Sequence, residues 1–342
     1  MNYIQPTLYD NVFDPQHLDI IEQKYLTWFQ SGWQSNRQLS YDHGHMQNYI
    51  ARPCLDLPID LSIIPYNIRQ HELLISFWNQ IKTVLDGDRA LYRAYSKAYH
   101  FGMDAYKHTD QQASKFTLES TNQPIRGNGF ETCILYMNKQ WNTDYFGQTV
   151  LYTDDNEIDM SVLPKYNRLF IFDSAQPHST TPLSRHCPFD KQIIVFNSMP
   201  KELCDPGVEY LLEHTKAVKH FQGLSFFDHL WNVYNTLIAL KQHHHVCLAG
   251  LWHAVYGTSA FDNPTKNKFT PDIVKHFIGE QAESLVSKFC SLPAPRVDAI
   301  CQMKDIELAY IEYANLYDQN PDGRQNEKLS RLNLLIEDVK YE

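Results

Sequence analysis

The chain has 342 residues, of which 43% are hydrophobic and 20% are charged, so it can bury an ordinary globular core. The 40 acidic and 30 basic residues give a formal charge of −10, which argues against a nucleic-acid partner, because phosphate-binding surfaces need clustered Lys and Arg. The 7 cysteines are scattered and form no C-x-x-C pair. That pattern is typical of reduced thiols and not of a disulfide framework or a zinc site.

The sequence shows neither the basic start and apolar run of a signal peptide nor an apolar stretch near the roughly 18 residues of a membrane span. We therefore expect a cytoplasmic protein with no membrane partner. Nothing in the residue pattern predicts its oligomeric state.

Two helices are predicted before a β-rich region. The first begins at Asp14, an N-cap residue followed by Pro15 at the first helical position. Its apolar face comprises Leu18, Ile21, Tyr25 and Trp28. The second runs from about residue 68 to residue 85 and ends just before Gly87. Its inward face comprises Leu74, Phe77, Trp78, Ile81 and Leu85.

Four β-rich runs follow, separated by Asn, Asp, Gly and Pro residues. They are ETCILYMN (131–138), TVLYT (149–153), RLFIFDS (168–174) and KQIIVFNS (191–198). Short strands that are rich in Ile, Val, Tyr and Phe and separated by turn residues are typical of an all-β barrel or jelly roll.

The pattern turns helical after Met199 and Pro200. Apolar residues recur every three or four positions near residues 207–220, 225–241, 246–256, 271–289 and 297–317, and a sixth helix is expected to close the chain. We therefore predict an α+β protein with two domains, residues 1–200 and residues 201–342.

The H-T-D motif at His108 and Asp110 is the first candidate metal site. Two histidines and one carboxylate on one face are the ligand set of non-haem iron oxygenases, and they leave positions open for other ligands. Because residues i and i+2 of an extended segment point the same way, one strand edge can supply two of these ligands. A second H-x-D copy at residues 17–19 lies in the first predicted helix, where the two side chains diverge.

The sequence after this motif makes it more specific. FETCILYMNKQWNTDYFGQTVLYT and LPKYNRLFIFDSAQPHSTTPLSRHCPFDKQIIVFN follow in order. This succession resembles the prolyl 4-hydroxylase branch of the 2-oxoglutarate oxygenases, especially the animal enzymes that hydroxylate hypoxia-inducible factor. The resemblance covers about residues 90–198. It implies a double-stranded β-helix, or jelly roll, in which His108, Asp110 and His178 bind Fe(II).

The same resemblance implies a pocket for 2-oxoglutarate. Lys191 opens the strand on which the family carries the basic partner of the far carboxylate, and a buried carboxylate needs such a fixed cation. Arg185 is the rival for that role. Tyr136 and Tyr99 match tyrosines of the pocket, and the alternative for Tyr136 is an ordinary core position.

The resemblance further implies a hydroxylation. Fe(II) and 2-oxoglutarate activate dioxygen, 2-oxoglutarate is decarboxylated to succinate and carbon dioxide, and a C–H bond is hydroxylated. Because Asp110 fills the carboxylate position, a halogenating variant is disfavoured. The expected substrate is a peptidyl proline. The alternatives are a small metabolite or nucleotide-like molecule, and a binding or regulatory protein without turnover.

The helical half resembles the HD-domain superfamily of metal-dependent phosphohydrolases, through the segment FFDHLWNVYNTLIALKQHHHVCLAGLWHAVYGTSAF. That family binds a metal through two histidines and two aspartates. His229 and His253 match the histidines, but Ala254 and Asn315 stand where the aspartates are expected. Losing two anionic ligands weakens a hard divalent cation, so we do not expect ordinary phosphohydrolysis.

The helical half is instead predicted to hold a pocket for a ligand or partner. Its residues are His229, His253, Tyr256 and Asn315. Asp318 is an alternative metal ligand if the helix register differs. The HHH run at residues 243–245 is expected in an exposed turn, because consecutive helical side chains point about 100° apart and cannot converge on one ion.

Overall fold

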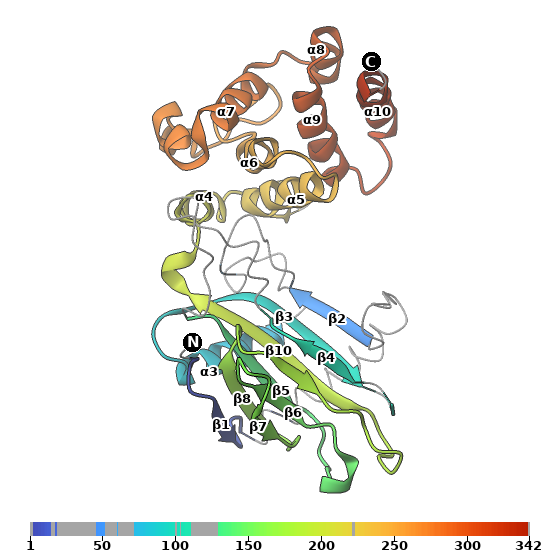
Figure 1. Ribbon diagram of the computed structural model, residues 1–342. Helices are drawn as coiled ribbons and strands as arrows, with labels where there is room; N and C mark the ends of the chain where they lie inside the picture. The colour runs from blue at the N-terminus through green and yellow to red at the C-terminus, as the bar shows by residue number, and fades with distance from the viewer. Residues whose placement is uncertain are drawn as a thin grey trace. The chain divides into compact units, whose positions relative to one another are not determined.

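The computed structural model describes residues 3–14, 18, 46–51, 60, 72–99, 101–102, 104–110, 129–220 and 223–340. The chain divides into two compact units, Met1–Cys204 and Asp205–Glu342. Strands dominate the first unit and helices the second (Figure 1). The predicted α+β class is confirmed. None of the described helices is long and apolar enough to cross a membrane.

Six antiparallel strands of the first unit form a large sheet in the order β1-β8-β5-β10-β3-β2. They are β1 (Thr7–Asp10), β2 (Met46–Ala51), β3 (Arg89–Tyr99), β5 (Glu131–Tyr136), β8 (Arg168–Asp173) and β10 (Lys191–Pro200). The strand β10 is central, and its register sets Lys191 opposite Tyr99 and Ile193 opposite Lys97. Helix α3 (Glu72–Ile81) packs against the other face of β10, where Trp78 stacks on Phe196 with ring centroids 6.4 Å apart.

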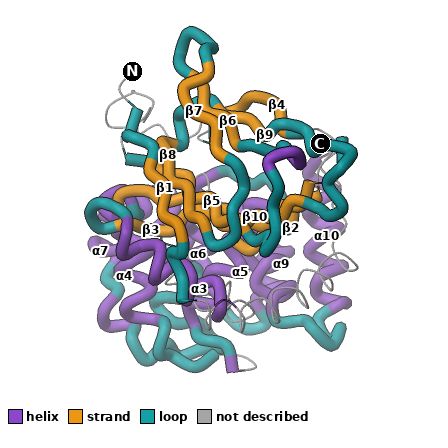
Figure 2. The backbone as a smooth tube through the Cα atoms, turned by 90° about the horizontal axis from the view of Figure 1, so that it is seen from below, coloured by secondary structure: helices purple, strands orange, loops and turns teal. Residues whose placement is uncertain are grey.

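Four further antiparallel strands form a small sheet in the order β4-β9-β6-β7. They are β4 (Ala105–His108), β6 (Thr149–Tyr152), β7 (Ile158–Val162) and β9 (His178–Thr180). In Figure 2 these strands lie beside one another, on one side of the strands of the large sheet. The pairing sets His108 opposite His178 and Thr149 opposite Thr180.

The inner faces of the two sheets share one hydrophobic core. Side chains alternate between the two faces of a strand, so every second residue of each strand points inward. The core cluster draws on both sheets and comprises Tyr95, Tyr99, Ala105, Ile134, Tyr136, Leu151, Val162, Phe170, Phe172, Leu183, Ile193 and Val195. Any polar side chain on the same inward positions is therefore held inside the unit.

The four predicted β-rich runs correspond to β5, β6, β8 and β10. The sequence analysis did not predict the other six strands as such. The longest of them, β3, reads RALYRAYSKAY, and its Ala, Arg and Lys residues favour helix when local propensity alone is considered. The second predicted helix is present as α3, and residues 68–71 lie outside the described residues. Of the first predicted helix, only Asp14 and Leu18 are described.

The second unit consists of seven helices among the residues that the structure describes. They are α4 (Pro206–Thr215), α5 (Phe226–Ala239), α6 (His244–Trp252), α7 (Pro271–Ser291), α8 (Arg296–Met303), α9 (Ile306–Asp318) and α10 (Asn326–Lys340). Capping residues set several of the boundaries: Ser225 and Asp228 form a capping box at the start of α5, and Asp205 caps α4.

Two predictions for the second unit are wrong. The single helix expected at 297–317 is divided into α8 and α9, because Lys304 adopts a left-handed conformation with φ of 52°. Asp305 then starts the next helix by accepting a hydrogen bond from the backbone N–H of Leu308. The HHH run does not lie wholly in a turn, because α6 already begins at His244.

Candidate active site

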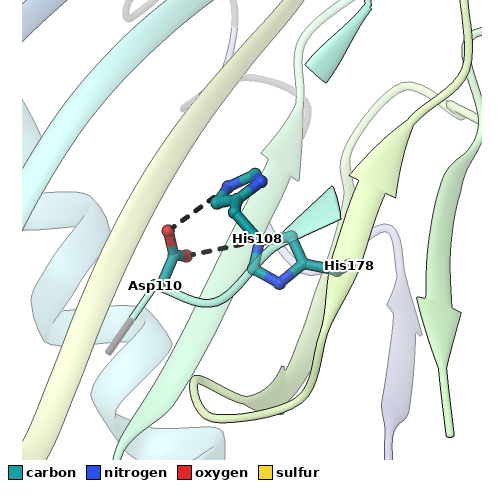
Figure 3. Close-up of side chains that lie close together, drawn as sticks. All are labelled: His108, Asp110 and His178. Carbon is teal, nitrogen blue, oxygen red and sulfur yellow. Dashed lines mark ion pairs between the residues drawn. The ribbon is translucent and has the colours of Figure 1, made fainter. Parts of the chain in front are cut away.

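The pairing of β4 with β9 brings two of the predicted iron ligands together. His108 ends β4 and lies opposite His178, the first residue of β9, and the two ring centroids are 4.3 Å apart. Asp110 follows two residues later and its backbone N–H donates to the carbonyl oxygen of Ser174 at 3.0 Å. One candidate ligand atom from each of the three side chains lies within 4.8 Å of the others (Figure 3). Among the described residues, this is the one cluster of three or more possible metal ligands.

Backbone carbonyls orient both imidazole rings. The Nδ1 atom of His108 is 2.7 Å from the carbonyl oxygen of Tyr106, and that of His178 is 3.0 Å from the carbonyl oxygen of Gln176. A carbonyl oxygen can only accept, so each Nδ1 carries the proton and each Nε2 keeps a free lone pair. The two Nε2 atoms face the carboxylate of Asp110 at 3.9 Å and 3.8 Å. This is the tautomer that a metal-binding histidine needs.

The carboxylate of Asp110 is held from the large sheet. Its Oδ2 accepts hydrogen bonds from the hydroxyl of Thr132 at 2.8 Å and from the side-chain amide of Asn197 at 3.2 Å. Its Oδ1 lies 3.7 Å from a guanidinium nitrogen of Arg93. The carboxylate thus has a fixed position before any ligand binds.

The electrostatics leave the three side chains in the protonation states that metal binding requires. Burial and then the neighbouring His178 lower the pKa of His108 to about 4, and burial also lowers the pKa of His178. Burial alone raises the pKa of Asp110, but His178 and Arg93 outweigh it and hold that pKa below its usual range. At neutral pH the site therefore offers two neutral imidazoles and one carboxylate.

This donor set fits Fe(II). Two imidazole nitrogens and one carboxylate oxygen from one side of a site are the ligands that non-haem iron oxygenases use, and they leave the opposite side for a chelating cosubstrate and dioxygen. The hydrogen bonds behind each ligand supply the outer support that tunes such a site.

A second polar group lies deeper between the sheets, around Lys191. This residue has no exposed surface, and its ammonium lies 5.0 Å and 5.6 Å from the ring centroids of Tyr99 and Tyr136. The hydroxyl of Tyr136 donates to Thr149 at 2.7 Å, and the Lys191 ammonium is 3.5 Å from the hydroxyl of Thr180. Burial and the charge of Lys97 lower the pKa of Lys191 to about 7.

The two candidate partners of the far carboxylate of 2-oxoglutarate occupy different environments. Lys191 projects into the buried space between the sheets, whereas Arg185 is exposed. Arg185 lines a surface groove together with Phe101, Asn142, Tyr145, Phe146 and Thr181. A buried anion therefore meets Lys191 and not Arg185.

Sequence reasoning missed several polar residues of this interior. They are Arg93, Lys97, Thr132, Thr149, Thr180 and Asn197. For Arg93, Lys97, Thr132 and Asn197, the signal is a polar residue at an inward position of a strand whose neighbours two positions away are apolar or aromatic. That signal can be read only once the strand register is known.

The helical unit places His229, His253 and Asn315 around one cavity of about 320 Å³. The cavity is also lined by His220, Ala254, Phe261, Phe289 and Arg296. Tyr256 is not one of its lining residues, and its hydroxyl donates to Glu283 at 3.0 Å. The predicted pocket thus retains three of its four residues.

The two histidines of this cavity face each other. Nε2 of His229 is 3.3 Å from Nε2 of His253, while Nδ1 of His229 lies 2.6 Å from the carboxylate of Asp318 and Nδ1 of His253 lies 2.7 Å from the carbonyl of Gly250. A hydrogen bond between the two Nε2 atoms requires one ring to carry both protons. Burial and then the neighbouring His229 lower the pKa of His253 well below its usual value.

The HHH run takes part in ordinary surface contacts. Nε2 of His245 lies 2.6 Å from a carboxylate oxygen of Glu307 and 3.1 Å from the side-chain nitrogen of Gln281. His243 and His244 are exposed. Among the described residues, these histidines belong to no cluster of metal ligands.

Comparison with protein families assigns the first unit. Residues 94–198 match the profile of the 2OG-Fe(II) oxygenase superfamily. This segment is a 2OG-Fe(II) oxygenase domain. Its cofactors are Fe(II) and 2-oxoglutarate, with dioxygen as oxidant, and the predicted class of oxidoreductase and dioxygenase is confirmed. In the second unit, residues 211–294 match a family described as a domain of unknown function, DUF6817.

Solved structures with similarity to the chain include oxygenases of several kinds. A prolyl hydroxylase from Trichoplax adhaerens, in complex with a hypoxia-inducible factor peptide, is 20% identical over 58% of this chain and 84% of its own, with a TM-score of 0.40. A prolyl-4-hydroxylase from Pseudomonas putida is 14% identical over 57% and 91%, with a TM-score of 0.33. HygX from Streptomyces hygroscopicus, with nickel and 2-oxoglutarate bound, is 9% identical over 57% and 82%, with a TM-score of 0.37. Similarity this low does not bear on the substrate. No curated protein matches the sequence.

Proposed function

We propose that this protein is an Fe(II)- and 2-oxoglutarate-dependent hydroxylase whose iron is bound by His108, Asp110 and His178. The observation that carries the proposal is the convergence of these three side chains, with both Nδ1 protons fixed by backbone carbonyls and both Nε2 atoms facing the carboxylate. We further propose that Lys191 binds the far carboxylate of 2-oxoglutarate, since it is a fully buried cation on the inward face of β10, beside the hydroxyl of Thr180.

Each group of the protein has a defined task in this reaction. Bound iron and 2-oxoglutarate supply the oxidising chemistry, in which decarboxylation to succinate accompanies insertion of an oxygen atom into a C–H bond. Lys191 neutralises the far carboxylate, and the hydroxyls of Tyr136, Thr149 and Thr180 surround the same end of the pocket. The aromatic core around them excludes water. Asp110 is held by Thr132 and Asn197, which fixes the orientation of its carboxylate.

We propose that the two sheets are those of a double-stranded β-helix and that the domains are residues 1–200 and residues 201–342. The order of strands in both sheets and the shared inner core support this assignment. The helical domain is proposed to be HD-like, with a ligand or partner pocket around His229, His253 and Asn315. The absence of a carboxylate at Ala254 argues against ordinary phosphohydrolysis there.

The substrate is proposed to be a peptidyl proline, and a small metabolite or nucleotide-like molecule is the alternative. A groove of about 1210 Å³ on the oxygenase unit has the exposed aromatic rings of Phe101 and Phe146 in its wall, which suits an extended peptide. A panel of proline-containing peptides and a panel of metabolites, each scored by formation of succinate, separates the two classes.

Anaerobic binding of 2-oxoglutarate to the Fe(II)-loaded protein tests the proposed site. Binding is measured in preference to turnover, because an oxygenase without its substrate can show no turnover. Asp110→Ala and Lys191→Ala are each expected to weaken binding about tenfold or more, because the first removes a ligand of the iron that 2-oxoglutarate chelates and the second removes the cation that pairs with its far carboxylate. Lys165→Ala is the matched control, since Lys165 is an exposed lysine of the same unit that pairs with Asp10.

The outcomes separate three readings. Binding that both variants weaken and the control leaves intact supports the hydroxylase. Failure of the correctly folded wild-type protein to bind 2-oxoglutarate overturns the proposal. Binding with neither peptide nor metabolite turnover favours a regulatory protein built on the oxygenase fold.

A further inference from the structure

A second buried lysine, Lys97, lies inside the oxygenase unit and has no role in the site described above. It lies on β3 between Tyr95 and Tyr99, both of which belong to the inner core, so all three side chains share the inward face of the strand. The register places Lys97 opposite Ile193, one inward position along β10 from Lys191. Only 6% of Lys97 is exposed.

The Lys97 ammonium has no hydrogen-bond acceptor in the described part of the chain. It lies 5.2 Å from the ring centroid of Tyr95, and its pKa also reflects the charges of Asp110 and Arg93. Asp110 does not compensate it fully, because that carboxylate already receives hydrogen bonds from Thr132 and Asn197. A cation–π contact is weaker than the hydration that a buried ammonium gives up.

An uncompensated buried ammonium costs stability and is retained where a ligand supplies the missing charge. The charges of the proposed site make this specific. Fe(II), Asp110, Lys191 and the dianion of 2-oxoglutarate already sum to neutrality. Lys97 and the guanidinium of Arg93 remain as further positive charges at the same end of the interior as Asp110, and of these two Lys97 is the more buried.

We propose that Lys97 is a second carboxylate-binding residue of this site. Its anion is either the carboxylate of 2-oxoglutarate next to the keto group or a carboxylate of the substrate, and both sources require the same ammonium–carboxylate pairing. The inference rests on the proposed function of the iron site and adds to it that an anionic group is recognised beside the metal. Lys97 positions this group and is not a metal ligand.

The first experiment uses two truncated analogues of 2-oxoglutarate. The analogue 2-oxopentanoate lacks the far carboxylate, and 4-oxopentanoate lacks the carboxylate next to the keto group. Binding of each to the Fe(II)-loaded protein is measured anaerobically for wild type, Lys97→Met, Lys97→Arg and Lys191→Met. Lys165→Met is the surface control.

If Lys97 binds the carboxylate next to the keto group, Lys97→Met weakens the binding of 2-oxoglutarate and of 2-oxopentanoate about tenfold or more. The binding of 4-oxopentanoate stays unchanged. Lys97→Arg restores most of that loss. Lys191→Met gives the complementary pattern: the affinity for 4-oxopentanoate falls, and the affinity for 2-oxopentanoate does not. Equal weakening of all three ligands by Lys97→Met, without rescue by arginine, overturns the proposal.

If the anion belongs to the substrate, Lys97→Met leaves the binding of all three ligands unchanged. A second measurement then tests whether Lys97 binds a carboxylate of the substrate. Lysine labelled with carbon-13 at Cε is incorporated, the diamagnetic ion Zn(II) replaces iron, and acetate is titrated into the 2-oxoglutarate complex. A saturable shift of the Lys97 resonance, assigned by its absence in Lys97→Met, supports a substrate carboxylate. No shift, together with unaffected ligand binding, overturns the proposal.

The proposed function and the proposed role of Lys97 can be contradicted separately. If wild type does not bind 2-oxoglutarate at all, the proposed function fails, and acetate titration of the Zn(II)-loaded protein still reports whether Lys97 binds a carboxylate. A thermal melt tests folding of the variant. Because Lys97→Met removes a desolvated charge, its Tm is expected not to fall below that of wild type, whereas a structural role predicts a clear decrease.

Discussion

Each unit of this protein holds a pair of buried or half-buried histidines, and the two pairs differ in where the nearest carboxylate lies. In the oxygenase unit, Asp110 faces the Nε2 atoms of both rings at 3.9 Å and 3.8 Å. In the helical unit, Asp318 lies on the opposite side of its ring, 2.6 Å from Nδ1 of His229. The Nε2 atoms of the second pair therefore face each other, 3.3 Å apart.

This difference shows that residue types alone do not make a metal site. Backbone carbonyls hold both Nδ1 atoms of the first pair and one Nδ1 atom of the second, and both pairs have an aspartate close by. A carboxylate on the Nε2 side completes a three-ligand face, whereas a carboxylate on the Nδ1 side only orients the ring. The oxygenase pair is arranged for a cation, whereas in the helical pair the two Nε2 atoms contact each other.

The largest expected effect distinguishes the two pairs directly. His178→Ala is expected to reduce Fe(II) affinity by about 100-fold or more, because it removes a ligand, and changes behind a ligand already cost about 10- to 100-fold. His253→Ala, which changes an equally buried histidine of the other pair, is expected to leave Fe(II) affinity unchanged. Competition of Fe(II) with a chelating dye measures both. Loss of iron from His253→Ala would contradict the distinction.

The next effect concerns pH and the buried cation of the oxygenase unit. Because the pKa of Lys191 is lowered to about 7 in the free protein, binding of a carboxylate raises that pKa and takes up a proton above pH 7. The affinity for 2-oxoglutarate is therefore expected to fall by up to about tenfold per pH unit as pH rises above 7. Lys191→Arg should remove this dependence, because arginine stays charged.

Calorimetry in two buffers of different ionisation enthalpy measures the proton uptake at pH 8. A proton uptake that is larger by nearly one proton in wild type than in Lys191→Arg agrees with the pairing. Equal uptake in both proteins would show that a different group takes up the proton.

A change in the helical unit should affect stability and not iron. Asp318→Ala leaves the buried Nδ1 of His229 without its partner, which is expected to cost about 1–3 kcal/mol of unfolding free energy. Urea unfolding followed by helical circular dichroism measures it. The control Asp322→Ala removes an exposed carboxylate that pairs with Arg324 and should have little effect. A lower Fe(II) affinity in Asp318→Ala would mean that the second pair also binds iron.

The smallest expected effect tests the support of Asp110. Thr132→Val keeps the shape of the side chain and removes the 2.8 Å hydrogen bond to Oδ2, while the bond from Asn197 remains. We expect Fe(II) affinity to fall about two- to tenfold, because one of the hydrogen bonds that hold the Asp110 carboxylate is lost while the others remain. The same dye competition resolves such a change. An unchanged affinity would assign the orientation of Asp110 to Asn197 and Arg93 alone.

Local sequence reasoning works best where the residues of an element interact mainly with their own neighbours. The runs that become β5, β6, β8 and β10 are visible because β-branched and aromatic residues alternate between turn residues. The strand β3 is not visible, because its Ala, Arg and Lys residues suit a helix until β2 and β10 pair with it. Likewise, the break between α8 and α9 depends on one left-handed residue, Lys304.

The sequence by itself determined the type of chemistry. The H-x-D motif at His108 and Asp110 predicts two ligands of a metal site, and the resemblance of the motifs that follow it to the 2-oxoglutarate oxygenases implies His178 as the third ligand and iron oxygenase chemistry. That Asn315 and Ala254 stand where HD-domain proteins have aspartates stays a prediction of the sequence.

Only the tertiary structure decided how these side chains meet. Strand register places His108 against His178, buries Lys191 while Arg185 stays exposed, and turns Lys97 into the same interior. The packing of the helices places Asp318 against Nδ1 of His229, on the opposite side of the ring from Nε2. The physical reason is that register and helix packing are set by many distant contacts at once, and a shift of one residue along a strand turns every side chain to the other face.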